Sequence, residues 1–345
     1  MRVLLDARIH RPFKTGIGRY IESLGLALAR REDVDLTLAV TRGSSGEKLA
    51  HDHGIDVFYA GHSRRPLMLG RTDFDLFHAT YPIIAPVIGV PVVVTVLDLI
   101  YDDPRWAGPA KRAAFRALTA TLLRSCRAAL AISQATADDL VRRRKPRCLV
   151  RVTPMGVETL NVVPVSNRLS REFLYVGSLR PHKGIAVLLK AMCEAPNARL
   201  TVLSSESTEQ WPRISKELSA SARARVSFQP FADDATRQDL LAKVAAVVVP
   251  SHVEGFGLPV IEALAAGTPV ICSDIPVFRE VADTHATFFP VGDHEALARA
   301  LETAPVLRNT DAAARGQRHA TKFTWDRCAA LTSAAYRTAL STAPL

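Results

Sequence analysis

The residues from Pro250 to Val281 read PSHVEGFGLPVIEALAAGTPVICSDIPVFREV, and they indicate the fold more strongly than any other part of the chain. The apolar run at 244–249 is typical of a buried strand. Pro259 is favoured at the start of a helix, because the first turn has no partner for the N–H group that proline lacks. Gly267 is typical of a helix end, and the apolar residues 270–272 predict another strand. The stretch therefore predicts a strand–loop–helix–strand unit.

The loop of this unit carries one acidic side chain, and the helix carries a second. Glu254 precedes Gly255 and Gly257 in the loop, and Glu262 is expected in the first turn of the helix. A carboxylate suits a pair of neighbouring sugar hydroxyls because it accepts two hydrogen bonds at once, and a helix N-terminus suits a phosphate. A surface acid or a helix-dipole partner would explain an isolated glutamate. The glycine-flanked pattern instead favours a site for a sugar, a diphosphate and a ribose.

A known family shows the same pattern. Residues 254–263, EGFGLPVIEA, closely resemble the E-x7-E motif of the family-4 glycosyltransferases, which are retaining enzymes with the GT-B fold. Ile21 replaces the third glycine of a dinucleotide fingerprint that would begin at Gly16, which disfavours an NAD site. Further segments that match the family lie along essentially the whole chain, at 1–24, 132–140, 152–157, 175–184 and 323–326.

Strand-like runs alternate with helical stretches in both halves, which predicts an α/β fold with parallel sheets. The predicted strands are 3–5, 36–40, 75–79, 92–96, 128–132 and 149–152 in the first half, and 173–176, 199–203, 226–228, 246–249, 270–272 and 287–289 in the second. The resemblance implies GT-B architecture, in which two Rossmann-like domains face each other across a cleft. Residues 1–165 would form the acceptor-binding domain and 166–323 the nucleotide-sugar-binding domain. The polar stretch 159–172 would join them, and 324–345 would pack back on the N-terminal domain as a helix.

The resemblance also implies roles for particular residues. The implied catalytic residues are Glu254, Lys183 and Arg180. The implied donor-binding residues are Glu262, Gly255, Phe256, Gly257, Leu258, Ser178, Gly16 and Gly18. The implied acceptor-side residues are Asp98, Leu97 and Tyr20. Taken alone, Arg180 and Lys183 would favour an ordinary solvated loop over a diphosphate site.

One position departs from the family pattern. Leu97 precedes Asp98 where many relatives carry histidine or sometimes tyrosine. Leucine can neither donate a hydrogen bond nor carry charge, so one interaction near the reacting sugar is absent. Acceptor chemistry is therefore the part of the reaction in which this chain is expected to differ.

Charge is concentrated in one segment. The formal net charge is +10, and residues 105–151 hold twelve lysines and arginines against Asp138 and Asp139. Nucleic-acid binding is disfavoured because aromatic residues do not interleave with the basic ones. An anionic membrane face or a phosphate-bearing acceptor fits better, and a solvated helix face is the simpler alternative.

The remaining composition indicates a cytoplasmic globular protein, with peripheral contact at the inner membrane face as an option. Five scattered cysteines suggest neither a disulfide framework nor a metal site. The acidic pair at 73–75 leads directly into a strand, so we predict no metal there. Residues 76–97 carry no charged side chain but contain three prolines, which favours two strands over a membrane span. The apolar run after Arg2 is too short for a signal peptide.

Together with these patterns, the resemblance implies a retaining transferase that moves a hexose from a nucleotide diphosphate sugar to a hydroxyl of a glycan or lipid-linked acceptor. The resemblance favours mannose, with GDP-mannose as the donor, and it implies no further cofactor. Two alternatives stay open. The chain could be a non-transferring GT-B enzyme such as a nucleotide-sugar epimerase, or a degenerate nucleotide-sugar-binding protein that has lost catalysis.

Overall fold

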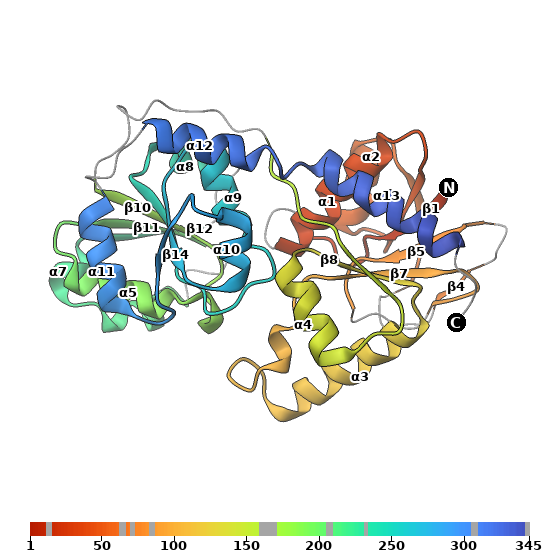
Figure 1. Cartoon of the computed structure of the whole chain (residues 1–345), viewed down its shortest axis with the longest axis horizontal. Coiled ribbons are helices and arrows are strands. Elements are labelled where there is room, and N and C mark those ends of the chain that lie inside the picture. Colours follow the sequence, from red (N-terminus) through yellow and green to blue (C-terminus); the bar gives the residue numbers. More distant parts are fainter. Residues whose placement is uncertain are drawn as a thin grey trace. The chain divides into compact units, whose positions relative to one another are not determined.

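The computed structural model describes residues 1–11, 16–61, 67–69, 73–82, 87–158, 171–204, 210–230, 234–304 and 310–341. The chain forms two compact units (Figure 1). Unit 1 comprises Met1–Gly156 and Phe323–Leu345, and unit 2 comprises Val157–Lys322. Most of the stretch predicted to join the domains, 159–170, lies outside the described residues.

Unit 1 is built on a parallel sheet with the strand order β3-β2-β1-β5-β7-β8-β9 among the described residues. Its strands are β1 (Arg2–Asp6), β2 (Asp35–Val40), β3 (Asp56–Tyr59), β5 (Leu76–Ala79), β7 (Val92–Val96), β8 (Ala128–Ala131) and β9 (Leu149–Val152). The short strands β4 (Leu67–Met68) and β6 (Val87–Ile88) pair separately. Its helices are α1 (Gly16–Ala29), α2 (Ser45–Asp52), the 3-10 helix η1 (Ile100–Asp102), α3 (Pro109–Ser125), α4 (Gln134–Arg144) and α13 (Trp325–Ser341).

Side-chain alternation along these strands gives the sheet of unit 1 two apolar faces. Leu4 belongs to the cluster that also holds Phe115 of α3 and Leu140 of α4. Leu5 points to the opposite face, where it lies against Gly25 of α1. The helix α13 packs against α1, so the C-terminal helix completes the layer on that side.

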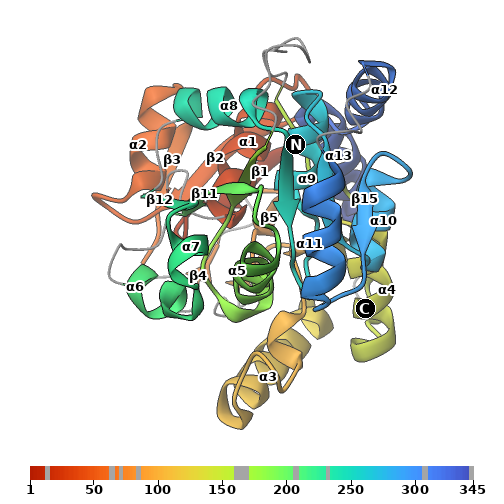
Figure 2. The same cartoon turned by 90° about the vertical axis from the view of Figure 1, so that its left-hand side faces the viewer.

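Unit 2 has a parallel sheet with the order β12-β11-β10-β13-β14-β15 among its described residues. Its strands are β10 (Glu172–Val176), β11 (Arg199–Ser204), β12 (Val226–Pro230), β13 (Ala246–Val249), β14 (Val270–Ser273) and β15 (Thr287–Phe289). Its helices are the 3-10 helices η3 (Pro181–Lys183) and η4 (Ser215–Glu217), and α5 (Ile185–Glu194), α6 (Trp211–Ile214), α7 (Ala220–Arg223), α8 (Asp234–Lys243), α9 (Leu258–Ala265), α10 (Pro276–Ala282), α11 (His294–Thr303) and α12 (Thr310–Ala320). Figure 2 shows α5 and α11 side by side on one face of this sheet, while α9 contacts α8, α10 and α12.

The predicted α/β class with two parallel sheets is confirmed, and each predicted strand is present within two residues of its expected bounds. The sequence did not predict β3, β4 or β6, because strands of only 4, 2 and 2 residues are too short to show a clear pattern. The uncharged segment 76–97 contains β5 and β7, as predicted. No helix in the described part of the chain is long and apolar enough to cross a bilayer.

The end of α9 also follows the prediction. Gly267 has a φ of +66°, in the left-handed region that glycine adopts without strain. Its N–H donates to the carbonyl of Leu264 at 2.9 Å, and the N–H of Thr268 donates to the carbonyl of Ala263 at 2.8 Å. These two bonds form a Schellman motif, which satisfies carbonyls that the end of a helix would otherwise leave without partners.

Candidate active site

Two loops of unit 2 meet where the strand order reverses. One follows β10 and covers 177–184, and the other follows β13 and covers 250–257. β10 and β13 are neighbours in the sheet but not in the chain. From β10 the chain continues outward to β11 and β12, and from β13 it continues outward in the opposite direction to β14 and β15. In open parallel sheets, ligands bind beyond the carboxyl ends of the strands at such a switch point.

Backbone contacts hold the two loops together. The N–H of His252 donates to the carbonyl oxygen of His182 at 2.8 Å. Gly184 has a φ of +71°, and a Cβ atom built on it would lie 1.9 Å from the carbonyl oxygen of Pro250. Glycine is therefore required at this position, because it permits both the backbone conformation and the close approach of the loops.

This approach brings the predicted residues Lys183 and Glu254 into contact. Lys183 Nζ donates to Glu254 Oε1 at 2.6 Å, and Ser251 Oγ donates to the same oxygen at 2.9 Å. The side chains of Lys183 and Glu254 are 26% and 10% exposed, so the ion pair lies at the edge of the protein interior. Sequence reasoning identified both charged residues but neither their direct pairing nor the contribution of Ser251.

The loop before α5 contains three basic residues, Arg180, His182 and Lys183, and its positive charge comes from Arg180 and Lys183. Arg180 is exposed at the start of η3, one turn before Lys183. His182 is buried, and burial with the nearby Lys183 charge lowers its pKa to about 4. His182 is therefore neutral at pH 7, while its backbone carbonyl joins the two loops. Ser178 is half-buried, and its carbonyl oxygen accepts a hydrogen bond from the Tyr175 hydroxyl, with 2.5 Å between the two oxygens.

The helix α9 begins immediately after a glycine with a left-handed backbone conformation. Gly257, the residue before α9, has a φ of +96°, and a Cβ atom there would lie 2.6 Å from the Phe278 ring. The preceding Phe256 is 2% exposed, so its side chain packs in the interior, and Gly255 is buried as well. Leu258 is the first residue of the helix, so its amide lies among those that have no intrahelical partner.

The expected position of Glu262 in the first turn is wrong. The helix begins at Leu258, because Gly257 supplies the turn into it. Glu262 is therefore the fifth residue of α9 and lies just beyond its first turn. The Glu262 carboxylate is buried, and its Oε2 accepts a hydrogen bond from Arg237 Nη1 of α8 at 2.5 Å. The two side chains are only 5% and 3% exposed. Sequence reasoning missed Arg237, and no local pattern around it indicates this partner.

The predicted residues of unit 1 lie in different environments. Gly16 is exposed at the start of α1, and Gly18, two residues further along, is buried. Asp98 lies two residues after the end of β7, and its Oδ1 accepts a hydrogen bond from the Ile100 amide at 3.1 Å at the turn into η1. Leu97 is 9% exposed.

Tyr20 requires a correction, because its side chain is fully buried and part of the core of unit 1. Its hydroxyl lies 2.7 Å from Thr95 Oγ1, which lies 2.7 Å from His78 Nε2. His78 Nδ1 in turn lies 2.6 Å from the Tyr336 hydroxyl of α13. Burial lowers the pKa of His78 to about 3, so it is neutral at pH 7. This network joins α1, the sheet and α13, and Tyr20 therefore has a structural role.

One group of side chains within the described residues has the composition of a metal site. Ligand atoms of Asp283, His285 and His319 all lie within 4.8 Å of one another at the end of α10 and α12. Burial and His319 lower the pKa of His285, as do the cationic Arg315 and Lys322. These cationic neighbours oppose a bound cation, and we assign the group no role.

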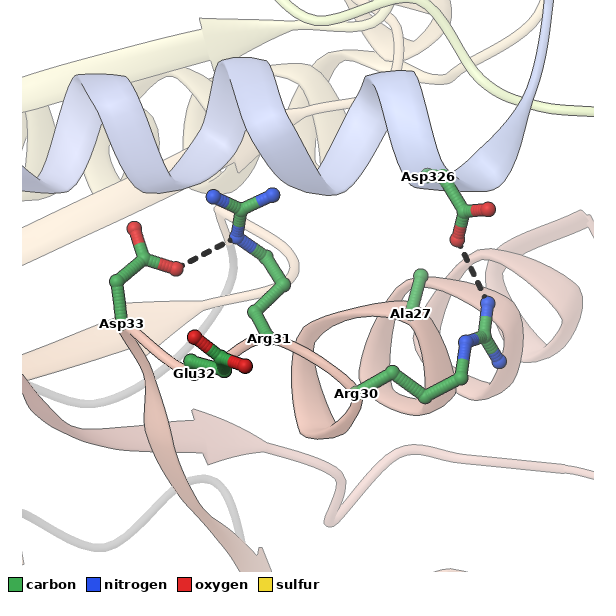
Figure 3. A pocket seen from close by; sticks show the side chains of 6 residues that line it. All are labelled: Ala27, Arg30, Arg31, Glu32, Asp33 and Asp326. Carbon is green, nitrogen blue, oxygen red and sulfur yellow. Dashed lines mark hydrogen bonds and ion pairs between the residues drawn. The ribbon is translucent and has the colours of Figure 1, made fainter.

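A pocket of about 600 Å³ in unit 1 is lined by Ala27, Arg30, Arg31, Glu32, Asp33 and Asp326 (Figure 3). It lies where α1 leads into β2, at the amino end of the parallel strands. Ion pairs cross it, from Arg31 Nε to Asp33 Oδ1 at 2.8 Å and from Arg30 Nη2 to Asp326 Oδ1 at 2.8 Å. Ligands of such sheets bind at the opposite edge, beyond the carboxyl ends of the strands. We therefore do not assign this pocket to a substrate, and its Arg30–Asp326 ion pair links α1 to α13.

Comparisons with known proteins agree with this geometry. The family Glycosyltransferase Family 4 matches residues 14–159, and Glycosyl transferases group 1 matches residues 161–321. The serotype-specific mannosyltransferase WbdA of Escherichia coli is 32% identical over 172 residues, which cover 46% of this chain and 20% of WbdA. The O-antigen chain mannosyltransferase RfbU of Salmonella typhimurium is 30% identical over 155 residues, covering 45% of this chain and 43% of RfbU. The matched stretches thus span less than half of these curated relatives.

Solved structures match over nearly the whole chain. The sucrose-phosphate synthase of Thermosynechococcus elongatus has a TM-score of 0.77 at 18% identity, covering 98% of both chains. HepE of Anabaena, solved with UDP and glucose, has a TM-score of 0.75 at 17% identity, covering 98% of this chain and all of HepE. At these identities the likeness concerns the fold alone. Two family matches that together span residues 14–321 and a GT-B fold along the whole chain show that this chain belongs to the family-4 glycosyltransferases.

Proposed function

We propose that this chain is a retaining hexosyltransferase that moves mannose from a nucleotide diphosphate sugar, with GDP-mannose favoured, to a hydroxyl of a glycan or lipid-linked acceptor. The Lys183–Glu254 ion pair carries this proposal, because it combines a cation and a carboxylate at the switch point of unit 2. The mannosyltransferases among the relatives support the choice of sugar. UDP-glucose bound to HepE supports a nucleotide-sugar donor of this general type.

In this proposal unit 2 holds the donor. Lys183 and Arg180 neutralise the diphosphate, assisted by the amides of Gly257 and Leu258 at the start of α9. Glu254 Oε1 already accepts from Lys183 and Ser251, which leaves Oε2 as the oxygen for a donor-sugar hydroxyl. Glu262 binds the ribose hydroxyls, and Arg237 holds its carboxylate in place.

The reaction breaks the bond between the anomeric carbon and the leaving phosphate oxygen. The acceptor oxygen attacks from the same face, and the leaving phosphate takes the acceptor proton, so the anomeric configuration is kept. Lys183 favours this step because its charge lies where negative charge develops on the leaving diphosphate. The route is the one that the family resemblance implies.

Unit 1 would supply the acceptor in this proposal. Asp98 follows the carboxyl end of β7, where parallel sheets bind ligands. Leu97 lies beside it and replaces the polar residue that many relatives carry. We propose cytoplasmic activity, with contact to the inner membrane face where the acceptor is lipid-linked.

A donor screen tests the proposal. Nucleotide sugars are compared for their ability to raise the melting temperature, since a ligand that binds only the folded protein stabilises it by mass action. The best donor is then incubated with candidate acceptors, and the anomeric configuration of the product is read by NMR. Transfer with retention supports the proposal. An epimerised nucleotide sugar would support the epimerase alternative, and binding without either reaction would support a degenerate binding protein.

A matched pair of variants connects this activity to the site. Lys183→Ala should lower both donor affinity and transfer. Lys243→Ala is the control, because Lys243 forms a similar ion pair with Asp239 at 2.6 Å on the exposed surface of α8. Equal activity of the two variants would reject the assigned role of Lys183.

A further inference from the structure

A second candidate site lies in unit 1, beside the basic helices α3 and α4. A pocket of about 750 Å³ is lined by Asp102, Arg116, Ala120, Arg142, Arg143 and Arg144. Arg116 and Ala120 lie one turn apart on α3, and the three consecutive arginines form the last turn of α4. The basic segment found in the sequence therefore contributes to a concave site as well as to a charged surface.

Asp102 lines this pocket and pairs with two of its arginines. It is 3% exposed, and its Oδ1 accepts from Arg144 Nη2 at 2.7 Å and from Arg116 Nε at 3.3 Å. The Arg144 side chain is itself only 9% exposed. The buried carboxylate thus orients the guanidinium groups of Arg144 and Arg116. Their other N–H groups remain as possible donors to a ligand.

Two buried polar atoms in this pocket lack a hydrogen-bond partner among the described residues. They are Asp102 Oδ2, which can only accept from a donor, and Arg144 Nε, which can only donate. Buried polar groups are nearly always satisfied by protein, water or ligand. A ligand that carries both an acceptor and a hydroxyl group would satisfy both atoms.

The net charge of the pocket indicates the kind of acceptor. Four guanidinium groups face two carboxylates, because Arg142 and Arg143 also pair with Asp139. The positive excess favours an anion, and the planar fork of arginine matches the oxygens of a phosphate. The side chains of Arg116 and Arg142 are 52% and 68% exposed, so they remain accessible from solvent.

We infer that this pocket binds a glycerophosphate group, with the phosphate on Arg116, Arg142 and Arg144 and a glycerol hydroxyl donating to Asp102. Such a group exists as free glycerol 3-phosphate and as the headgroup of phosphatidylglycerol. The inference does not rest on the proposed transfer reaction, since it concerns residues outside the donor site.

Calorimetric titration with glycerol 3-phosphate and with methyl phosphate at pH 8 and low salt tests the chemistry. At this pH both monoesters are dianions without a P–OH proton, so only glycerol 3-phosphate has a hydroxyl for Asp102. We expect glycerol 3-phosphate to bind at least fivefold more tightly. Equal affinities would overturn the role of the hydroxyl and of Asp102.

A double variant tests the location without disturbing the buried pair. Arg116→Gln with Arg142→Gln should weaken glycerol 3-phosphate binding at least tenfold while leaving GDP binding unchanged. The control is Arg30→Gln with Arg299→Gln, which removes the same charge from exposed ion pairs elsewhere. If both double variants lose binding equally, or if neither does, the pocket is not the site.

Vesicle flotation separates the two sources of the group. Vesicles of phosphatidylglycerol in phosphatidylcholine are compared with pure phosphatidylcholine vesicles, with and without free glycerol 3-phosphate. Vesicle binding that is displaced by glycerol 3-phosphate and lost in the site variant would support the lipid source. Binding of glycerol 3-phosphate without vesicle binding would support a soluble ligand. The inference is overturned if the wild-type protein binds neither.

Discussion

The buried pair of Glu262 and Arg237 makes a quantitative prediction about the second glutamate of the motif. Glu262→Ala removes one partner and leaves the guanidinium of Arg237 in a site where its side chain is 3% exposed. Removing one partner of a buried ion pair typically costs about 3–5 kcal/mol, because the remaining charge stays desolvated. The variant should therefore be strongly destabilised, whether or not Glu262 contacts a ligand.

The expected size can be expressed as a melting temperature. For a unit of this size, each kcal/mol shifts the melting temperature by about 2–4 °C, so Glu262→Ala should lower it by about 6–20 °C. Asp274→Ala is the matched control, since Asp274 pairs with Arg279 at 2.7 Å with both side chains about half exposed. Solvent screens exposed pairs and makes them contribute little to stability, so the control should lower the melting temperature by a few degrees at most.

A double variant separates stability from ligand binding. Glu262→Leu with Arg237→Met replaces the pair by apolar side chains of similar volume and should recover most of the lost stability. If Glu262 binds ribose hydroxyls, nucleotide affinity will not recover, and the loss should be about 1.5–3 kcal/mol, or tenfold and more. Titration with GDP and its 2′,3′-dideoxy analogue identifies the contact, because only the wild type should prefer GDP.

Two results would refute this reasoning. A melting temperature of Glu262→Ala within about 2 °C of the wild type would show that the pair does not hold α8 to α9. Equal preference for GDP over the dideoxy analogue in the wild type and the double variant would show that Glu262 has no contact with the ribose. Its role would then be structural alone.

Four further predictions concern Glu254, His78, Leu97 and the need for a metal ion. Glu254→Ala should abolish transfer but leave GDP affinity unchanged or raised in titrations, because it removes the charge that competes with a diphosphate for Lys183. His78 has a folded pKa of about 3, below the value of about 6.5 in an unfolded chain. Its contribution to the free energy of unfolding is therefore complete above pH 6.5 and is lost as the pH falls toward 3, by at most about 1.4 kcal/mol per pH unit; urea unfolding of the wild type and His78→Gln at several pH values measures it. Leu97→Ala should alter acceptor kinetics more than GDP affinity, and loss of GDP binding would show that this loop is misassigned. Transfer should persist in a chelator, because the cationic loop can neutralise the diphosphate; loss restored by magnesium would contradict this.

Local sequence patterns predicted the features that depend on residues close together in the chain, such as loops and helix ends. The φ of +66° at Gly267 and the position of Glu254 both follow from residues a few positions away. The same holds for the parallel strands, whose apolar runs are readable without knowledge of their neighbours. The helix start was placed one residue too late, because Gly257 and not Pro259 determines where α9 begins.

Contacts between distant segments could not be predicted in this way. Arg237 lies 25 residues before Glu262 in the chain, and only the packing of α8 on α9 brings them together. The resemblance implied an acceptor-side role for Tyr20, yet its hydroxyl completes a buried network that ends 316 residues later at Tyr336. Such contacts depend on tertiary packing, so they cannot be predicted from a short segment of the sequence.

The two glutamates of the motif differ because their surroundings differ. Glu262 lies with an arginine in a nearly dry site, where separating the pair would leave each charge buried without its partner. Glu254 faces a lysine whose side chain is 26% exposed, so that pair can open when a diphosphate approaches. A rigid carboxylate suits recognition of an unreacting ribose, whereas a carboxylate with an exchangeable cation suits the sugar whose bond is broken. The motif thus combines a fixed contact and an adjustable one on a single loop and helix.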